Sequence, residues 1–380
     1  MNNVLSDEQV LVLQTAEKVG ERFGRRNWLA YGRERREPVP LWEELQKSGL
    51  TGAGVVEGSG TLDAILVQEG LARAGIPLLH FLTTHFSRVM IARHGTRMQF
   101  ERFVDPTVKH GKKISFALTE AEAGSETWRI KTFAERRNGG FVLNGQKTFI
   151  TGARESDYLV VVARTKPLQK VSDKRDGISV FALETRTSGV MFEPLNIELY
   201  SPETQYTVYF DMVELGEENL VGRLDRGVDV LFDGLNVERM LIAACSIGLG
   251  DHVLRRAAEY GRQRVVFGHP VGSYQGLQFR MARAKARLEA ARVLNYEAAS
   301  LFDAGKPCGA EANMAKLVAS EAGLEAFEAA MQTFGGSAYD LGTDIITFYP
   351  VIRLFLTAPV ANELILSYIG THVLGLPKSY

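Results

Sequence analysis

Two segments decide how this chain folds: SFALTEAEAGSE at residues 115–126 and LNGQKTFITGA at residues 143–153. The first segment gathers Thr119, Gly124 and Ser125 in one short loop after an apolar strand start. Such a loop can bring hydroxyl groups and backbone N–H groups close to an anionic or ring-bearing ligand. This segment therefore predicts one wall of a binding site.

The second segment predicts a β-hairpin. Asn144 and Gly145 form a favoured two-residue turn between FVL and QKTFI, both of which have strand composition. Beyond the turn, Phe149 and Thr151 are two residues apart, so we expect their side chains on the same face of the strand. The loop and the hairpin together predict a binding platform that is built on strands.

Helices are predicted on both sides of this platform. Ser6 is a helix cap ahead of acidic residues, and apolar residues then recur at helical spacing, so residues 1–112 are predicted to be mainly helical. Residues 223–380 are predicted to be helical as well, and within them residues 276–300 carry an apolar stripe.

The region between these helices is predicted to be rich in strands. Its β-rich runs are separated by loops of Gly, Pro, Asp and Ser, and they lie at 158–163, 178–183 and 206–210. The order of helices, strands and helices predicts an α+β fold with three domains. These are an N-terminal α-helical domain (1–112), a middle β-domain (113–222) and a C-terminal α-helical bundle (223–380).

The composition excludes several classes of protein. The 380 residues suffice for two or three domains, and a net charge of −1 gives no basic field for nucleic acid. The two cysteines, Cys245 and Cys308, offer no disulfide framework and suit a reducing compartment. The longest apolar runs are too short for a membrane span, and the N-terminus lacks signal-peptide character. We therefore predict a cytoplasmic protein with no nucleic-acid partner, no membrane partner and no metal site.

Four motifs together resemble those of the acyl-CoA dehydrogenase family. The two segments quoted above resemble the family's first signature and its Asn-Gly-x-Lys hairpin. Two further motifs follow in the family's order: Arg264-Val-Val-Phe267-Gly268 with a later Gln275, and Gln332-Thr-Phe-Gly335-Gly336. Any one motif alone would be a weak signal, but the set covers nearly the whole chain.

The resemblance implies a fold and an activity. The fold would combine a helical N-terminal domain, a middle β-barrel-like domain and a C-terminal four-helix bundle. FAD would lie between the β-domain and the C-terminal helices, usually in a homotetramer. The family desaturates acyl-CoA thioesters: a carboxylate removes the α-proton, and the β-hydrogen leaves as hydride to the flavin N5. The electrons then pass to an electron-transfer flavoprotein.

By the same resemblance, the platform would hold one side of FAD. Thr119 would hydrogen-bond the flavin ring, Ser125 would bind the pyrophosphate, and Thr151 would reach the N5 region. Phe149 stands where the family usually has Trp, and it would stack on the isoalloxazine face. An ordinary Ser/Thr-rich turn and a core Phe are the simpler interpretations of these residues.

A second set of residues would bind the FAD of a neighbouring subunit. Arg264 resembles an arginine that reaches the pyrophosphate, since a guanidinium fork suits paired phosphates, and Phe267 would pack beside the cofactor. The simpler interpretation of Arg264 is an exposed arginine. The inter-subunit pocket would be completed by Gln275, Gln332, Gly335 and Gly336.

The catalytic base is where the sequence departs from the family. The usual glutamate position falls on Pro359, which cannot accept a proton. A minority of the family, typified by isovaleryl-CoA dehydrogenase, carries its base on a C-terminal helix, in a segment that residues 235–239 resemble. Glu238 is therefore the predicted base, and Glu363, one turn after Pro359, is its rival.

The residues around Glu238 predict its environment. Asn236 is a reasonable helix cap, which would place Glu238 in the first turn of a helix. The helix N-terminus would stabilise the carboxylate, while burial beside substrate and flavin would raise its pKa. A solvent-facing glutamate paired with Arg239 is the simpler alternative. Asn236 and Arg239 also match positions that contact the CoA or acyl-thioester end in relatives.

Two other functions stay open. Pro359 and the altered residues within the motifs fit a non-catalytic subunit that completes a heterotetramer with a related, active subunit. The same fold could instead react reduced flavin with oxygen, as an oxidase or a monooxygenase.

Overall fold

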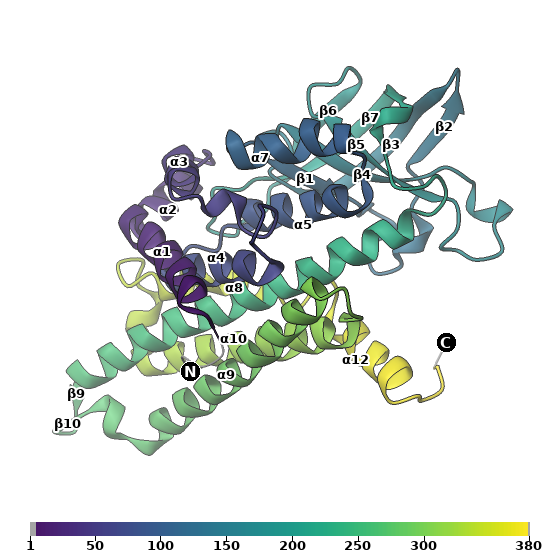
Figure 1. Cartoon of the computed structure of the whole chain (residues 1–380). Helices are drawn as coiled ribbons and strands as arrows, with labels where there is room; N and C mark the ends of the chain where they lie inside the picture. The colour runs from purple at the N-terminus through teal and green to yellow at the C-terminus, as the bar shows by residue number, and fades with distance from the viewer. Residues whose placement is uncertain (1–4, 379–380) are drawn as a thin grey trace.

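The computed structural model describes residues 5–378 and places a strand-rich layer above a set of long helices (Figure 1). The predicted first cap is confirmed, because the Ser6 hydroxyl accepts a hydrogen bond from Gln9 N at 3.2 Å. α4 and α5 are buried along almost their whole length, since α8 packs against both of them. The helices before the first strand are α1 (Asp7–Phe23), α2 (Arg25–Arg33), α3 (Val39–Lys47), α4 (Thr61–Arg73), α5 (Leu79–His94), α6 (Arg97–Gln99) and α7 (Asp105–Lys109).

The strands of the middle region form one sheet in the order β6-β7-β3-β2-β4-β5-β8, and β1 pairs in parallel with β4. The three predicted β-rich runs lie within β4, β5 and β7, so these strands are confirmed. The strands are β1 (Ile114–Ala117), β2 (Phe133–Arg137), β3 (Gly140–Thr151), β4 (Tyr158–Arg164), β5 (Ile178–Glu184), β6 (Val190–Pro194), β7 (Gln205–Gly216) and β8 (Leu220–Val221).

Both faces of β4 and β5 are buried. Val161 and Phe181 face a core that lies within the folded sheet, where Phe181 meets Phe141 of β3 with ring centroids 5.1 Å apart. Val160 and Val180, on the opposite face, belong to the core that the sheet shares with the helices. Burial on two sides explains why these strands are continuously apolar rather than alternating.

The predicted turn at Asn144-Gly145 is wrong. The chain reverses six residues earlier, at Asn138-Gly139, where φ values of 47° and 79° suit a two-residue hairpin turn between β2 and β3. Asn144 and Gly145 lie inside β3 at an irregularity in its pairing with β7. A Cβ at Gly145 would approach the Thr132 Cα to 2.7 Å, so close backbone packing rather than a turn requires glycine there.

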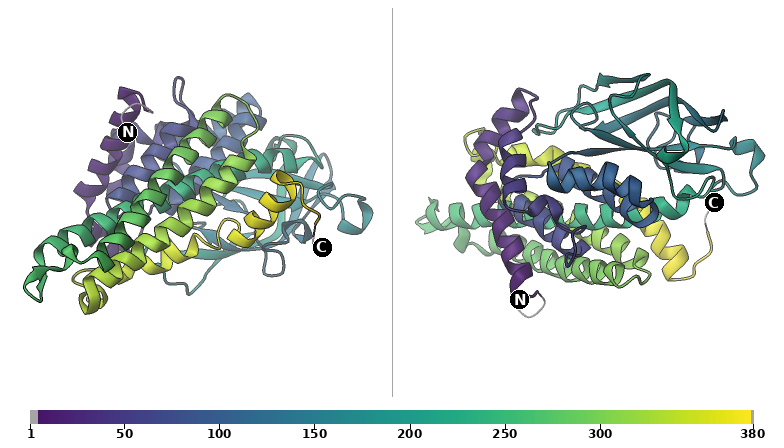
Figure 2. Two further views of the ribbon diagram at one scale, coloured as in Figure 1. Left: turned by 90° about the horizontal axis from the view of Figure 1, so that it is seen from below. Right: turned by 45° about the horizontal axis from the view of Figure 1, so that its top comes forward.

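The C-terminal region is built around α8, whose 37 residues span about 55 Å at roughly 1.5 Å per residue. α8 begins beneath the sheet and ends at the β9–β10 hairpin, on the opposite side of the molecule (Figures 1 and 2). Within residues 5–378 no helix combines the length and apolar character needed to cross a membrane. The elements are α8 (Gly227–Gln263), β9 (Val265–Val266), β10 (His269–Pro270), α9 (Gln275–Asp303), α10 (Gly309–Phe334), α11 (Tyr349–Leu354) and α12 (Asn362–Tyr368).

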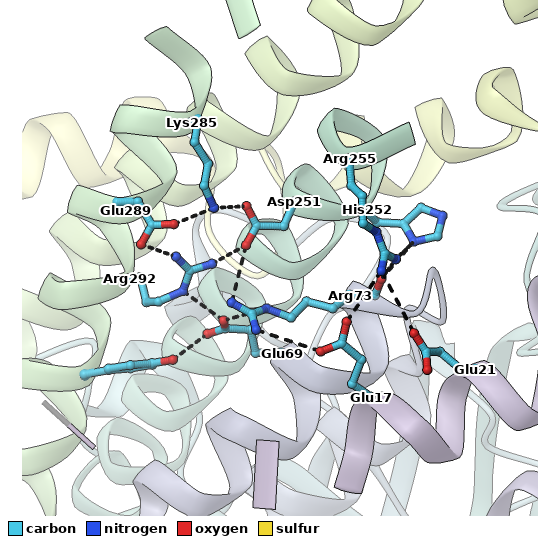
Figure 3. Close-up of polar contacts among 11 residues, drawn as sticks. Glu17, Glu21, Glu69, Arg73, Asp251, His252, Arg255, Lys285, Glu289 and Arg292 are labelled. Atoms are coloured by element: carbon cyan, nitrogen blue, oxygen red, sulfur yellow. Dashed lines mark hydrogen bonds and ion pairs between the residues drawn. The ribbon is translucent and has the colours of Figure 1, made fainter. Parts of the chain in front are cut away.

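A buried network of charges joins the N-terminal helices to the C-terminal ones (Figure 3). Glu69 of α4 accepts hydrogen bonds from Arg292 Nε at 2.8 Å and from the Tyr296 hydroxyl at 2.9 Å, both on α9. Arg292 also pairs with Asp251 of α8. Because three helices meet at these groups, the network fixes α4 against the long helices that carry the C-terminal part of the site.

Candidate active site

The loop that follows β1 is held against β3 by a buried ion pair. Lys147 Nζ lies 2.8 Å from Glu120 Oε1 and donates a second hydrogen bond to the Leu118 carbonyl at 2.8 Å. Glu120 also accepts from the backbone N–H groups of Lys131 and Thr132, so both ends of the loop are tied to it. Burial lowers the pKa of Lys147 to about 8, and Glu120 opposes that shift.

This anchoring leaves the predicted binding residues of the loop accessible. The Thr119 carbonyl accepts from Thr148 N at 2.9 Å, which keeps the half-buried Thr119 beside β3. Gly124 and Ser125 are exposed, and a Cβ at Gly124 would meet no atom within 4 Å. The loop therefore has a fixed base and an open tip.

Phe149 is turned outward by a β-bulge. The pairing of β3 with β7 shifts between Lys147 and Ile150, so Thr148 and Phe149 together face a single partner residue. Phe149 adopts a φ of 59° and is 59% exposed, while Lys147 and Ile150 on either side are buried. Strict alternation from Lys147 would have placed this ring inside the sheet.

A chain of hydrogen bonds fixes the end of β3. The Thr151 hydroxyl donates to Gln205 Oε1 at 3.0 Å, and the Thr151 carbonyl accepts from Ser115 Oγ at 2.6 Å. Ser115 is linked to Ser156, which is linked to His80 Nε2 of α5 at 2.7 Å. The half-buried Thr151 is thus positioned by residues of the sheet and of an N-terminal helix.

The second predicted set of residues lies at the other end of α8. Tyr260 of α8 and Phe334 of α10 stack with ring centroids 4.4 Å apart, which gathers the ends of both helices. Phe267, in the β9–β10 hairpin, is 91% exposed with a φ of 52°. This end is far from the sheet, so the two sets do not meet within one chain (Figure 1). The exposed residues gathered there are Arg264, Gln275, Gln332, Gly335 and Gly336.

Glu238 is not in the first turn of a helix, contrary to the sequence prediction. α8 begins at Gly227, and Asn236 is an interior residue whose side chain accepts from Arg239 Nη1 at 3.0 Å. Gly227 packs tightly on β5, and from there buried residues recur at helical spacing. The helix therefore starts well before Asn236. Without a helix N-terminus beside it, Glu238 is governed by burial, which raises its pKa to about 8 against the opposing charges of Arg239 and Lys316.

The rival carboxylate and the proline lie near the start of α12. Pro359 precedes this helix, and Glu363 lies in its first turn with an exposed side chain. The side chain of Glu238 is half-buried and is therefore the less exposed of the two. It makes no hydrogen bond to another group among the side chains that the structure describes.

Two residues near Glu238 were not identified from the sequence. Lys316 of α10 has no exposed side-chain surface, and its charge acts on Glu238. Tyr368 lies by the start of α10, where a Cβ at Gly309 would be 3.5 Å from its hydroxyl and 4.0 Å from Asn236 Oδ1. An isolated lysine in the apolar run MAKLVAS, residues 314–320, was the available signal for Lys316.

Comparisons with known proteins identify the family of this chain. The sequence matches the models of the acyl-CoA dehydrogenase N-terminal domain over residues 6–110, middle domain over 115–213 and C-terminal domain over 225–365. The fold and these matches define a flavoprotein oxidoreductase. The chain belongs to the acyl-CoA dehydrogenase family, so the predicted family, α+β fold, enzyme class and FAD cofactor are confirmed.

Individual relatives are similar along nearly their whole length. Acyl-CoA dehydrogenase FadE12 of Mycobacterium tuberculosis is 34% identical over 366 residues, which cover 94% of each chain. Butyryl-CoA dehydrogenase from Megasphaera elsdenii has a similar structure, with a TM-score of 0.91, 29% identity and coverage of 97% of this chain and 99% of that one. The FAD complex of PigA has a TM-score of 0.89, 25% identity and 98% coverage of both chains.

Proposed function

We propose that this enzyme desaturates an acyl-CoA thioester between its α and β carbons, with Glu238 as the base that removes the α-proton. The observation that carries this proposal is the half-buried carboxylate of Glu238 on α8, which has no hydrogen-bond partner among the described residues, combined with a proline at the family's usual base position. A base works best when its pKa lies near the working pH, and burial brings the pKa of Glu238 to about 8.

Arg239 and Asn236 are proposed to hold the thioester end of the substrate. Arg239 is next to Glu238, and its Nε is buried without a hydrogen-bond partner among the described residues. Its Nη1 donates to Asn236 Oδ1, which orients the guanidinium. An unpaired buried donor is costly, so a substrate acceptor at this point would be bound favourably. Placing the α-carbon beside Glu238 is the task we assign to this pair.

The FAD site is proposed to use residues from two subunits. FAD supplies the hydride acceptor when it is bound. Four residues of the platform suit one side of it: the open loop offers Thr119 and Ser125, and the outward Phe149 and the fixed Thr151 lie on β3. The second side would come from the partner's copy of the α8 end, with Arg264, Phe267, Gln275, Gln332, Gly335 and Gly336.

This arrangement requires an oligomer and an electron acceptor. The exposed Phe267 in the β9–β10 hairpin favours assembly with a further copy, so we propose a homotetramer, with a heterotetramer containing a related subunit as the alternative. An electron-transfer flavoprotein or a similar acceptor is the proposed electron partner, because the family's reaction leaves two electrons on the cofactor.

The test is flavin bleaching by acyl-CoA thioesters in the absence of oxygen. Purified holoenzyme is mixed with butyryl-, isovaleryl- and octanoyl-CoA, and the visible flavin absorbance is followed. Wild-type enzyme should bleach with at least one of them, and Glu238→Gln should abolish bleaching while FAD stays bound. Glu363→Gln is the matched control and should bleach normally.

Two outcomes would contradict the proposal. Full bleaching of Glu238→Gln would exclude this base. A wild-type protein that binds FAD but bleaches only after a related subunit is added would favour the partner-dependent alternative. Comparing oxygen consumption with dye-linked turnover separates a dehydrogenase from an oxidase.

A further inference from the structure

Thr151 of β3 and Gln205 of β7 lie directly opposite each other where these two strands pair. Their neighbours Ile150 and Tyr206 belong to the core within the folded sheet, so the side chains of Thr151 and Gln205 lie on the other face. There the Thr151 hydroxyl donates a hydrogen bond to Gln205 Oε1 at 3.0 Å. Gln205 is only 8% exposed, and a hydrogen bond that is shielded from water is stronger than an exposed one. Gln205 therefore sets the direction of the Thr151 hydroxyl.

The backbone of Thr151 is fixed by separate contacts. Its carbonyl accepts from Ser115 Oγ of β1 at 2.6 Å, and the next residue, Gly152, donates its N–H to the Thr204 carbonyl at 2.8 Å. Ser115 is held in turn by Ser156, whose Oγ lies 2.6 Å from Ser115 Oγ. Because the main chain is held in this way, the Thr151 hydroxyl can respond to a ligand only by rotation of its own side chain.

The hydrogen bond to Gln205 decides what the Thr151 hydroxyl offers to a cofactor. A hydroxyl group has one proton to donate and two lone pairs that accept. Because the proton is directed at Gln205 Oε1, the rest of Thr151 Oγ1 presents lone pairs alone. At this position the strand offers a hydrogen-bond acceptor rather than a donor.

Flavin N5 changes its hydrogen-bonding character during the proposed reaction. The C–H bond at the β-carbon breaks, its hydrogen and both of its electrons move to N5, and the α-proton goes to Glu238. N5 of the oxidised flavin has a lone pair and accepts, whereas the N5–H of the reduced flavin donates. An oxygen atom that can only accept at this point therefore favours the reduced form.

We propose that Gln205 is a positioning residue for the flavin: it holds the Thr151 hydroxyl as an acceptor towards N5 and so favours the reduced cofactor. This inference rests on the proposed placement of Thr151 at flavin N5. Stabilising the reduced form makes the bound FAD a stronger oxidant of the acyl thioester. A pair that served the sheet alone would hold β3 against β7 but would leave the reduction potential of the flavin unchanged.

The reduction potential of the bound FAD distinguishes these two roles. The FAD-loaded protein is reduced with dithionite beside a reference dye in the absence of oxygen, so the measurement needs no acyl-CoA. Gln205→Met removes the acceptor at nearly the same side-chain length and frees the Thr151 proton to bond the oxidised N5. We expect the ratio of reduced to oxidised flavin at a given potential to fall by about three- to tenfold, as for one hydrogen bond. For a two-electron couple this is a shift of about 15–30 mV to lower potential.

A double variant tests whether Gln205 acts through the hydroxyl. Thr151→Val should lower the potential by itself, and Gln205→Met should add no further shift in the Thr151→Val background. Thr207→Val is the matched control, because it removes a hydrogen bond of 3.3 Å between the hydroxyls of Thr148 and Thr207 on the same two strands. This control should keep the wild-type potential. If Gln205→Met does not fold, Gln205→Leu replaces it.

A potential in Gln205→Met that equals or exceeds that of the wild type would overturn the role of Gln205, as would additive shifts in the double variant. These failures can be distinguished from failure of the proposed function. If Thr151→Val lowers the potential and Gln205→Met does not, only the inference about Gln205 is wrong. If neither variant changes it, the placement of Thr151 at N5 is wrong as well. The dehydrogenation is measured separately, by bleaching with acyl-CoA thioesters.

Discussion

Glu120 and Lys147 form an ion pair with 2.8 Å between Oε1 and Nζ, and both side chains are buried. The two residues come from the two segments that carry the binding platform, the loop after β1 and strand β3. The pair therefore makes one rigid unit of Thr119 and Phe149, which the sequence separates by thirty positions.

Breaking this pair should detach the loop. Lys147→Met leaves Glu120 charged and buried without its partner, which typically costs about 3–5 kcal/mol. We expect a lower Tm and a lower FAD content, measured by thermal unfolding and by flavin absorbance. Lys131→Met is the matched control, because its ion pair with Glu122 is exposed to solvent and should contribute little. Equal effects of the two substitutions would contradict the anchoring role.

The carboxyl of Glu238 should make stability fall with rising pH. Its folded-state pKa is about 8 against an ordinary 4.5, so the folded protein holds this proton more tightly than the unfolded chain. The stabilisation is complete below the unfolded pKa near 4.5 and is lost as the pH rises through about 8.

Glu238→Gln should consequently flatten the dependence of Tm on pH between 5 and 9, measured by thermal unfolding with saturating FAD. Some slope should remain, because burial also raises the pKa of Glu203 to about 7. A Glu238→Gln profile that parallels the wild type would show that this carboxyl is not desolvated in the folded state.

The network around Glu69 should contribute to the free energy of unfolding, because it holds α4 of the N-terminal region against α8 and α9. Glu69→Gln removes the counter-ion of Arg292 on α4 but leaves its ion pair with Asp251, so we expect a loss of about 1.5–3 kcal/mol, as for one buried hydrogen bond to a charged group. Urea unfolding measures the change. Glu101→Gln removes an exposed pair with Arg97 and is expected to leave the midpoint unchanged. If Glu69→Gln behaves like that control, the network is not energetically coupled to folding.

The two Asn-Gly sequences should respond differently to an added methyl group. At Gly145 a Cβ would lie 2.7 Å from the Thr132 Cα, so Gly145→Ala should destabilise by about 1–3 kcal/mol through overpacking. At Gly139 a Cβ would meet nothing within 4 Å, and Gly139→Ala should cost only about 1 kcal/mol for its positive φ of 79°. The reverse order of Tm values would contradict the close packing of Gly145 against Thr132.

The exposed β9–β10 hairpin should be needed to retain the cofactor. Phe267 is 91% exposed in the single chain, and Phe267→Ala should weaken FAD binding and shift size-exclusion elution towards smaller species. Met98→Ala, which truncates another exposed apolar side chain at 70% exposure, should change neither. An FAD content and elution volume equal to those of the wild type would rule out a partner-completed site at this hairpin.

Many of the secondary-structure elements could be predicted from local patterns in the sequence. The strands β4, β5 and β7, the cap at Ser6 and the α+β order could be predicted because turn chemistry, capping and hydrophobic period depend on residues close in the chain. The resemblance of four motifs to those of the acyl-CoA dehydrogenases indicated the family and, through it, the cofactor. The sequence does not show which Asn-Gly pair forms the hairpin turn, since Asn138-Gly139 and Asn144-Gly145 carry the same local signal.

Which groups are buried together became visible in the tertiary structure alone. Glu120 and Lys147 are 27 residues apart, and Lys316 and Asn362 are 46 apart, so no local period relates them. The outward turn of Phe149 depends on the pairing of β3 with β7, and the distance between the two predicted FAD sets depends on the length of α8. Desolvation, ion pairing and long-range register arise from elements that packing brings together, and the sequence alone does not specify that packing.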